Sequence, residues 1–93
     1  MSWLSKKQGK IYEKIWSMPY SKTLKFDDVS KLLVALGCDR KRAGGANVSF
    51  QYGGEVWGMH PPHPNPEMKM PYIRALRVFL TDSGLKQLVE EGE

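Results

Sequence analysis

The sequence is poor in the residues that most often carry chemistry near neutral pH. It holds one cysteine, Cys38, and two histidines, His60 and His63. A single cysteine excludes an internal disulfide and a zinc site made of thiolates, and it is typical of a protein from a reducing compartment. Because imidazole is the side chain that titrates nearest pH 7, any general acid or base at neutral pH is expected first at the histidines.

The chain also lacks long apolar stretches. No run approaches the ~18 residues that span a bilayer, and the N-terminus has no uninterrupted apolar segment of the secretory type. We therefore expect a cytoplasmic protein without a membrane partner. Its 93 residues, 41% of them hydrophobic and 26% charged, suit one small folded domain. The formal charge of +4 permits a nucleic-acid or acidic protein partner but does not require one.

Apolar residues at helical spacing predict three helices. The first covers 3–18, is capped by Ser2 or Ser5 and is stopped by Pro19. The second begins at Asp27 and Asp28, which supply an N-cap and an acidic first turn, and it ends at Gly37. The third runs from about Met70 to Gly84. The acidic stretch that follows, 86–93, is expected to fray.

Between the second and third helices the apolar period falls to two, which predicts strands. These cover 38–42, 47–52 and 55–60, and the glycine pairs at 44–45 and 53–54 are expected to form the turns. Large apolar residues then face inward, and the outward face carries Asn47, Ser49, Gln51 and His60. Prolines exclude regular structure in 61–66. The sequence therefore predicts an α+β fold: a three-stranded antiparallel sheet with helices on one face, in two layers.

The residues leave several kinds of chemistry open. His60 or His63 could act as a general acid or base, although histidines beside prolines often only fill a loop. Prolines interrupt their His-x-x-His spacing and no carboxylate or thiol cluster accompanies it, so we expect neither a metal nor a cofactor. Basic residues could contact RNA phosphates or simply be solvated; they are Arg40, Lys41, Arg42, Arg74 and Arg77.

Four pieces in order resemble the HicA family of toxins from bacterial toxin–antitoxin pairs. They are Leu-Leu-Val-Ala-Leu-Gly at 32–37, Gly-x-x-x-x-Phe at 45–50, His-Pro-Pro-His-Pro-x-Pro-Glu-Met-Lys at 60–69, and the helix with its Gly-Leu exit at 73–85. The resemblance implies a double-stranded-RNA-binding-like fold at 20–86, preceded by a helical extension at 1–19 and followed by the acidic tail at 87–93. It also implies ribosome-independent mRNA cleavage and neutralisation by a HicB-like antitoxin.

The chain departs from the family at the position that matters most. The family's usual catalytic histidine stands in Gly-Ser/Thr-His, where this chain has Gly45, Ala46 and Asn47. Asparagine does not titrate, so it cannot take a proton from a ribose 2′-hydroxyl. Two interpretations stay open: either His60 replaces the missing base, with Asn47 orienting substrate and Lys69 or Arg74 neutralising phosphate, or the protein binds RNA or its partner without cutting.

Overall fold

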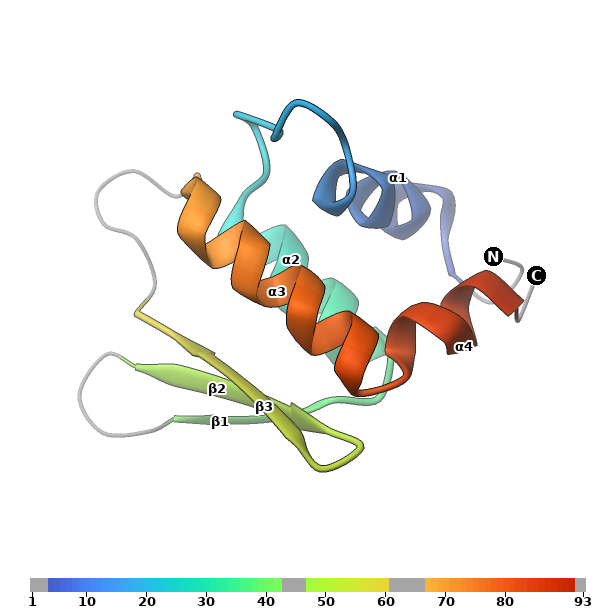
Figure 1. The fold of residues 1–93 in the computed structure, drawn as a ribbon, viewed down its shortest axis with the longest axis vertical. Coiled ribbons are helices and arrows are strands. Elements are labelled where there is room, and N and C mark those ends of the chain that lie inside the picture. The colour runs from blue at the N-terminus through green and yellow to red at the C-terminus, as the bar shows by residue number, and fades with distance from the viewer. Residues whose placement is uncertain (1–3, 43–46, 61–66, 92–93) are drawn as a thin grey trace.

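The computed structural model describes residues 4–42, 47–60 and 67–91. Within them the chain forms four helices and one three-stranded sheet: α1 (Lys6–Ile15), α2 (Phe26–Ala35), β1 (Asp39–Arg42), β2 (Val48–Tyr52), β3 (Glu55–Met59), α3 (Met70–Asp82) and α4 (Leu85–Glu91). The predicted Gly44-Gly45 turn, the proline-rich segment 61–66 and the possible helix cap Ser2 lie outside the described residues. The predicted α+β fold is confirmed (Figure 1).

The sheet is antiparallel with the strand order β1-β2-β3. Tyr52 pairs with Glu55, and the two glycines between them have φ of +57° and +82°. These values suit the two-residue hairpin turn that the Gly53-Gly54 pair predicts. An L side chain at Gly53 would also bring its Cβ to 2.5 Å from the Ser83 carbonyl oxygen. Both the positive φ and this close approach therefore require glycine at position 53.

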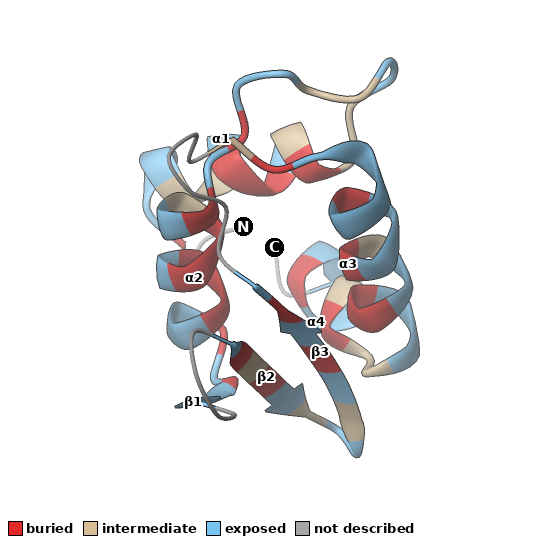
Figure 2. Cartoon of the chain, turned by 90° about the vertical axis from the view of Figure 1, so that its left-hand side faces the viewer, coloured by how far each residue is buried: buried red, intermediate tan, exposed pale blue. Residues whose placement is uncertain are grey.

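Helices α2 and α3 lie on one face of the sheet, and α1 crosses on their far side (Figures 1 and 2). The core between the sheet and these helices contains a stack of Phe50 on Trp57, with ring centroids 5.7 Å apart. Phe26 of α2 packs on Phe50 from the helix side, with ring centroids 6.3 Å apart. Val48, Phe50, Trp57 and Met59 are buried as the alternation predicts, which leaves the outer face of the sheet to solvent.

Each strand is one residue shorter than the sequence predicts, and three further differences concern a helix cap or a whole helix. Helix α1 starts at Lys6, where Ser5 accepts a hydrogen bond from the Gln8 amide in a capping box, and it ends at Ile15. Helix α2 starts at Phe26 after Lys25, so Asp27 and Asp28 lie in its first turn and neither is the N-cap. The backbone dipole still favours their charge there.

The expected frayed tail is the third difference, and that prediction is wrong. Residues Leu85–Glu91 form α4, with Leu85 and Val89 completely buried. The Tyr12 hydroxyl donates a hydrogen bond of 3.0 Å to Glu90 Oε2, which ties α4 to α1. Two buried apolar side chains and this bond outweigh the acidic composition on which the prediction rested.

Candidate functional site

Asn47 and His60 stand at the same end of one hairpin. Asn47 immediately precedes β2 and His60 immediately follows β3, and the last paired residues are Val48 and Met59. Since successive side chains alternate between faces, the two residues beyond this inward-facing pair point outward together. Both are exposed. The hairpin therefore brings to one point two polar residues that are thirteen positions apart.

The two side chains are in hydrogen-bond contact. His60 Nδ1 lies 3.1 Å from Asn47 Oδ1. An amide oxygen only accepts, so Nδ1 donates and carries the proton of the neutral ring. In the neutral ring of this tautomer, Nε2 is the nitrogen that can accept a proton from a ligand. Asn47 cannot be a base, but it fixes the tautomer and orientation of an imidazole that can be one.

Next to this pair the outer face is hollowed. Asn47, Ser49, Gly58 and His60 border a shallow hollow, with Val48 and Met59 between them along the strands. The side chains of Val48 and Met59 are buried on the opposite face, so they contribute main chain to its floor. His60 and the hollow are adjacent, so a ligand in the hollow would lie beside the imidazole.

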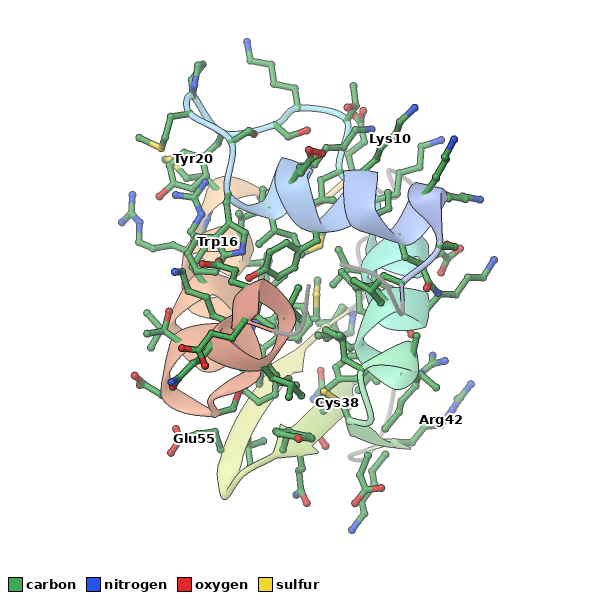
Figure 3. The ribbon with its side chains drawn as sticks, turned by 90° about the vertical axis from the view of Figure 1, so that its right-hand side faces the viewer. Lys10, Trp16, Tyr20, Cys38, Arg42 and Glu55 are labelled. Atoms are coloured by element: carbon green, nitrogen blue, oxygen red, sulfur yellow. The ribbon has the colours of Figure 1, made fainter. Side chains whose placement is uncertain are left out.

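The basic run of β1 does not act as one patch, because the pairing register divides it between the two faces. Lys41 pairs with Ser49 and so shares the outer face with Asn47 and His60. Arg40 pairs with Phe50 and Arg42 with Val48, both of which face the helices. All three basic residues of β1 are exposed because the strand lies at the edge of the sheet. Figure 3 shows Arg42 projecting at the side of the sheet where α2 lies.

Lys69 and Arg74 belong to a second region at the start of α3. Lys69 is the N-cap residue of α3 and lines a groove with Tyr20, Lys22 and Met70. Arg74 Nε donates to the Tyr20 hydroxyl at 3.5 Å, and this hydrogen bond lowers the pKa of Tyr20. The start of α3 and the end of β3 lie on the same side of the molecule in Figure 1.

Arg77 is occupied within the fold. Its Nε donates to the Ile15 carbonyl at 2.7 Å and its Nη2 to the Ser17 carbonyl at 2.8 Å, which satisfies two carbonyls at the end of α1. The guanidinium also lies 4.4 Å from the Tyr20 ring centroid and 5.8 Å from that of Trp16. Figure 3 shows both rings at the end of α1. These contacts place Arg77 at the joint between α1 and α3, and its expected contact with RNA stays a prediction.

Two features of the site were missed by the sequence reasoning. Alternation along the third strand puts Gly58 on the outward face, and a glycine inside a strand is a signal of close approach by a ligand or backbone. Tyr20 lies between the first two helices, and no local pattern in the sequence links it to Arg74 and Arg77. His63, the other histidine expected in the site, lies outside the described residues.

Comparison with family sequence models decides the family. The model described as "HicA toxin of bacterial toxin-antitoxin" matches residues 26–88, which is more than half of the chain. The chain belongs to the HicA toxin family. Comparison with curated proteins and with solved structures gives no match. As a HicA toxin, the protein is the toxin component of a toxin–antitoxin system.

The match begins at Phe26, after α1, and includes the hairpin with Asn47 and His60. The division of the chain at residues 19 and 86 nevertheless stays a prediction, since α1 packs on α2 and α3 and α4 contacts α1. In the part of the HicA chain that the structure describes, no helix is long and apolar enough to cross a bilayer.

Proposed function

We propose that this HicA protein binds RNA in the cytoplasm and cleaves mRNA at the Asn47–His60 pair without a metal ion. The observation that carries the proposal is the 3.1 Å contact between His60 Nδ1 and Asn47 Oδ1. It puts an oriented imidazole beside the position where the family's histidine usually stands. The base thus moves from the start of β2 to the end of β3, across one rung of the hairpin.

The chemistry that fits one oriented imidazole is transesterification within the RNA. His60 Nε2 takes the proton of a ribose 2′-hydroxyl, and the 2′-oxygen forms a bond to the adjacent phosphorus. The bond from phosphorus to the 5′-oxygen breaks, that oxygen takes a proton from water, and the hydroxide left behind takes the proton from His60. The products are a 2′,3′-cyclic phosphate and a 5′-hydroxyl. Lys41, on the same outer face, is placed to offset phosphate charge.

Neutralisation follows from the same geometry. The site lies on an exposed face rather than in a cleft, so a partner protein that covers the outer face would block RNA access. We propose a HicB-like antitoxin as that partner. Lys69 and Arg74, near the start of α3, are proposed as further RNA contacts, and Arg40 and Arg42 as peripheral ones.

Induced expression tests the proposal in cells. The wild-type protein is expected to arrest growth with loss of mRNA, and His60→Ala to abolish both effects. A general base usually contributes about 10²- to 10⁴-fold to the rate, so the residual activity should be too low to arrest growth. The matched variant His63→Ala tests the second predicted histidine. Arrest and mRNA loss that persist in both variants would remove histidine catalysis from this protein.

One observation favours a second candidate function. Asn47 occupies the family's histidine position, and an amide cannot transfer the proton. The alternative is a non-catalytic module that binds RNA or its protein partner through the same face. It predicts RNA binding that weakens with salt, no cleavage at any protein concentration, and no difference between wild type and His60→Ala in growth.

A further inference from the structure

Gly58 lies inside β3, one residue before the end of the strand, although the fold does not need a glycine there. Its φ is not positive, unlike those of Gly37, Gly53, Gly54 and Gly84. A Cβ at Gly58 would meet the Val48 carbonyl oxygen at 3.6 Å and Ser49 Cβ at 3.9 Å, which are ordinary contacts. Neither backbone conformation nor packing therefore excludes a side chain. Glycine inside a strand weakens it, so its presence calls for another reason.

The reason lies on the outer face of the sheet. Gly58 and Ser49 are paired across the ladder, and both border the hollow beside Asn47 and His60. A side chain at position 58 would stand in this hollow, next to the imidazole. The missing Cβ thus keeps open a space that begins at the base and has a hydroxyl on its other side.

The same row continues to a positive charge. Lys41 pairs with Ser49, and Ser49 pairs with Gly58, so the three residues form one line across all three strands on the outer face. Strands lie about 4.8 Å apart, so this line is about 10 Å long, and the Asn47–His60 row runs beside it about 7 Å away along the strands. Along these two rows lie, in order, the His60 imidazole, the open floor at Gly58, the Ser49 hydroxyl and the Lys41 ammonium group.

We propose that Gly58 determines whether substrate enters this site: the sugar–phosphate backbone of RNA passes over Gly58, with its reacting 2′-hydroxyl at His60, a phosphate oxygen at the Ser49 hydroxyl and the neighbouring phosphate toward Lys41. This inference rests on the proposed RNA-directed function and specifies the path of the substrate. The hydroxyl donates to phosphate and the ammonium group offsets its charge.

A graded series at one position tests the path. Gly58→Ala and Gly58→Val add one and three carbons to the hollow, and the readouts are binding of a fluorescein-labelled single-stranded RNA of mixed sequence and cleavage of the same RNA. We expect RNA binding to weaken about tenfold in the alanine variant and about a hundredfold in the valine variant, with cleavage falling in parallel. Thermal unfolding midpoints should stay equal to or above that of wild type, because both residues favour strands over glycine.

Val56→Ile is the matched control. Val56 faces outward on the same strand two residues away, is 59% exposed and does not border the hollow. The extra methylene should leave RNA binding within about twofold of wild type. If the valine variant of Gly58 does not fold, the alanine variant decides, because its Cβ has room.

The outcomes separate this inference from the function beneath it. Wild-type protein that neither binds nor cleaves the RNA would contradict the proposed function, and the path would fall with it. Wild-type protein that binds RNA, together with Gly58 variants that bind and cleave equally well, would overturn the path alone. Variants that keep RNA binding but lose the antitoxin would also overturn it, and would assign the hollow to the protein partner.

Discussion

At the scale of single residues, the roles of Asn47 and His60 depend on the rung that joins them. An imidazole at the end of a strand is free to rotate unless a neighbour holds one nitrogen, and Asn47 Oδ1 does so at 3.1 Å. Neither residue signals this alone: one is an amide at a loop, and the other is a histidine before two prolines. The site exists only because the Gly53-Gly54 turn sets the register.

Cys38 gives a prediction of its own, because its thiol is buried beneath the sheet edge. Burial first, and then the neighbouring Asp39 charge, raise the pKa of Cys38 to about 11. The protonated thiol is a poor nucleophile, so the folded protein should react with Ellman's reagent at pH 8 far more slowly than the protein unfolded in urea.

The difference in the Cys38 pKa between the folded and unfolded states gives the sign of the effect of pH on stability. The folded state holds this proton more tightly than the unfolded state, whose thiol titrates near 8.5. Stability from this group is therefore complete below pH ~8.5 and is lost as the pH rises toward ~11. In Cys38→Ala this part of the alkaline loss should be missing from urea unfolding curves. A thiol that reacts at pH 8 as fast in the folded as in the unfolded protein would contradict the burial argument.

Arg77 gives the second residue-scale prediction. Arg77→Ala removes two charge-assisted hydrogen bonds to carbonyls and a cation–π contact, so it should cost about 2–4 kcal/mol of unfolding free energy in urea. Arg74→Ala is the control, since its exposed side chain makes one longer bond to Tyr20 and should cost under about 1 kcal/mol. An Arg77→Ala protein of normal stability but weakened RNA affinity would instead support the predicted contact between Arg77 and RNA.

At the scale of elements, α4 offers a matched pair of identical substitutions. Leu85 is completely buried and Leu88 is 44% exposed, one turn apart on the same helix. Leu85→Ala should cost about 2–5 kcal/mol and Leu88→Ala within about 0.5 kcal/mol. For a chain of this size the first corresponds to a fall of roughly 10 °C or more in the thermal midpoint. Equal, small effects would mean that the C-terminal segment frays as its composition suggested.

The elements show what the sequence could and could not predict. The spacing of apolar residues and the positions of glycine and proline were enough to predict the three long helices and the sheet. Gly37 ends α2 with φ of +101°, and Gly84 follows α3 with φ of +88°. They failed at α4, because seven residues with a Lys, a Gln and two Glu carry too weak a pattern. What stabilises α4 is the burial of Leu85 and Val89 in the core together with the Tyr12–Glu90 hydrogen bond, and such contacts leave no local signal in the sequence.

The site follows the same division. Alternation along β2 and β3 was enough to place Asn47, Ser49 and His60 on one face, and the structure confirms this. Alternation along β1 also separates Lys41 from Arg40 and Arg42, but which of them faces outward can be assigned only from the register with β2. The capture of Arg77 by the end of α1 depends on tertiary packing, so sequence alone treats it as a free cation.

At the scale of the whole molecule, the two faces of the sheet separate the residues that stabilise the fold from those of the proposed function. The inner face carries the aromatic stack and the helices, and α1 and α4 add to that side. The outer face carries the proposed base His60, the hollow and Lys41, and no described helix covers it (Figure 2). Substitutions on the outer face should therefore change RNA activity with little effect on folding, whereas those at Arg77 or Leu85 should do the reverse.

Cleavage by purified protein tests the central claim most directly. Wild type, Asn47→Ala and His60→Ala are compared on one single-stranded RNA in the presence of EDTA, with the 2′,3′-cyclic phosphate ends as readout. We predict metal-independent cleavage by wild type, a loss of about tenfold for Asn47→Ala, where the base persists but is no longer oriented, and a loss of about 10²- to 10⁴-fold for His60→Ala. Cleavage by His60→Ala at the wild-type rate would contradict the account.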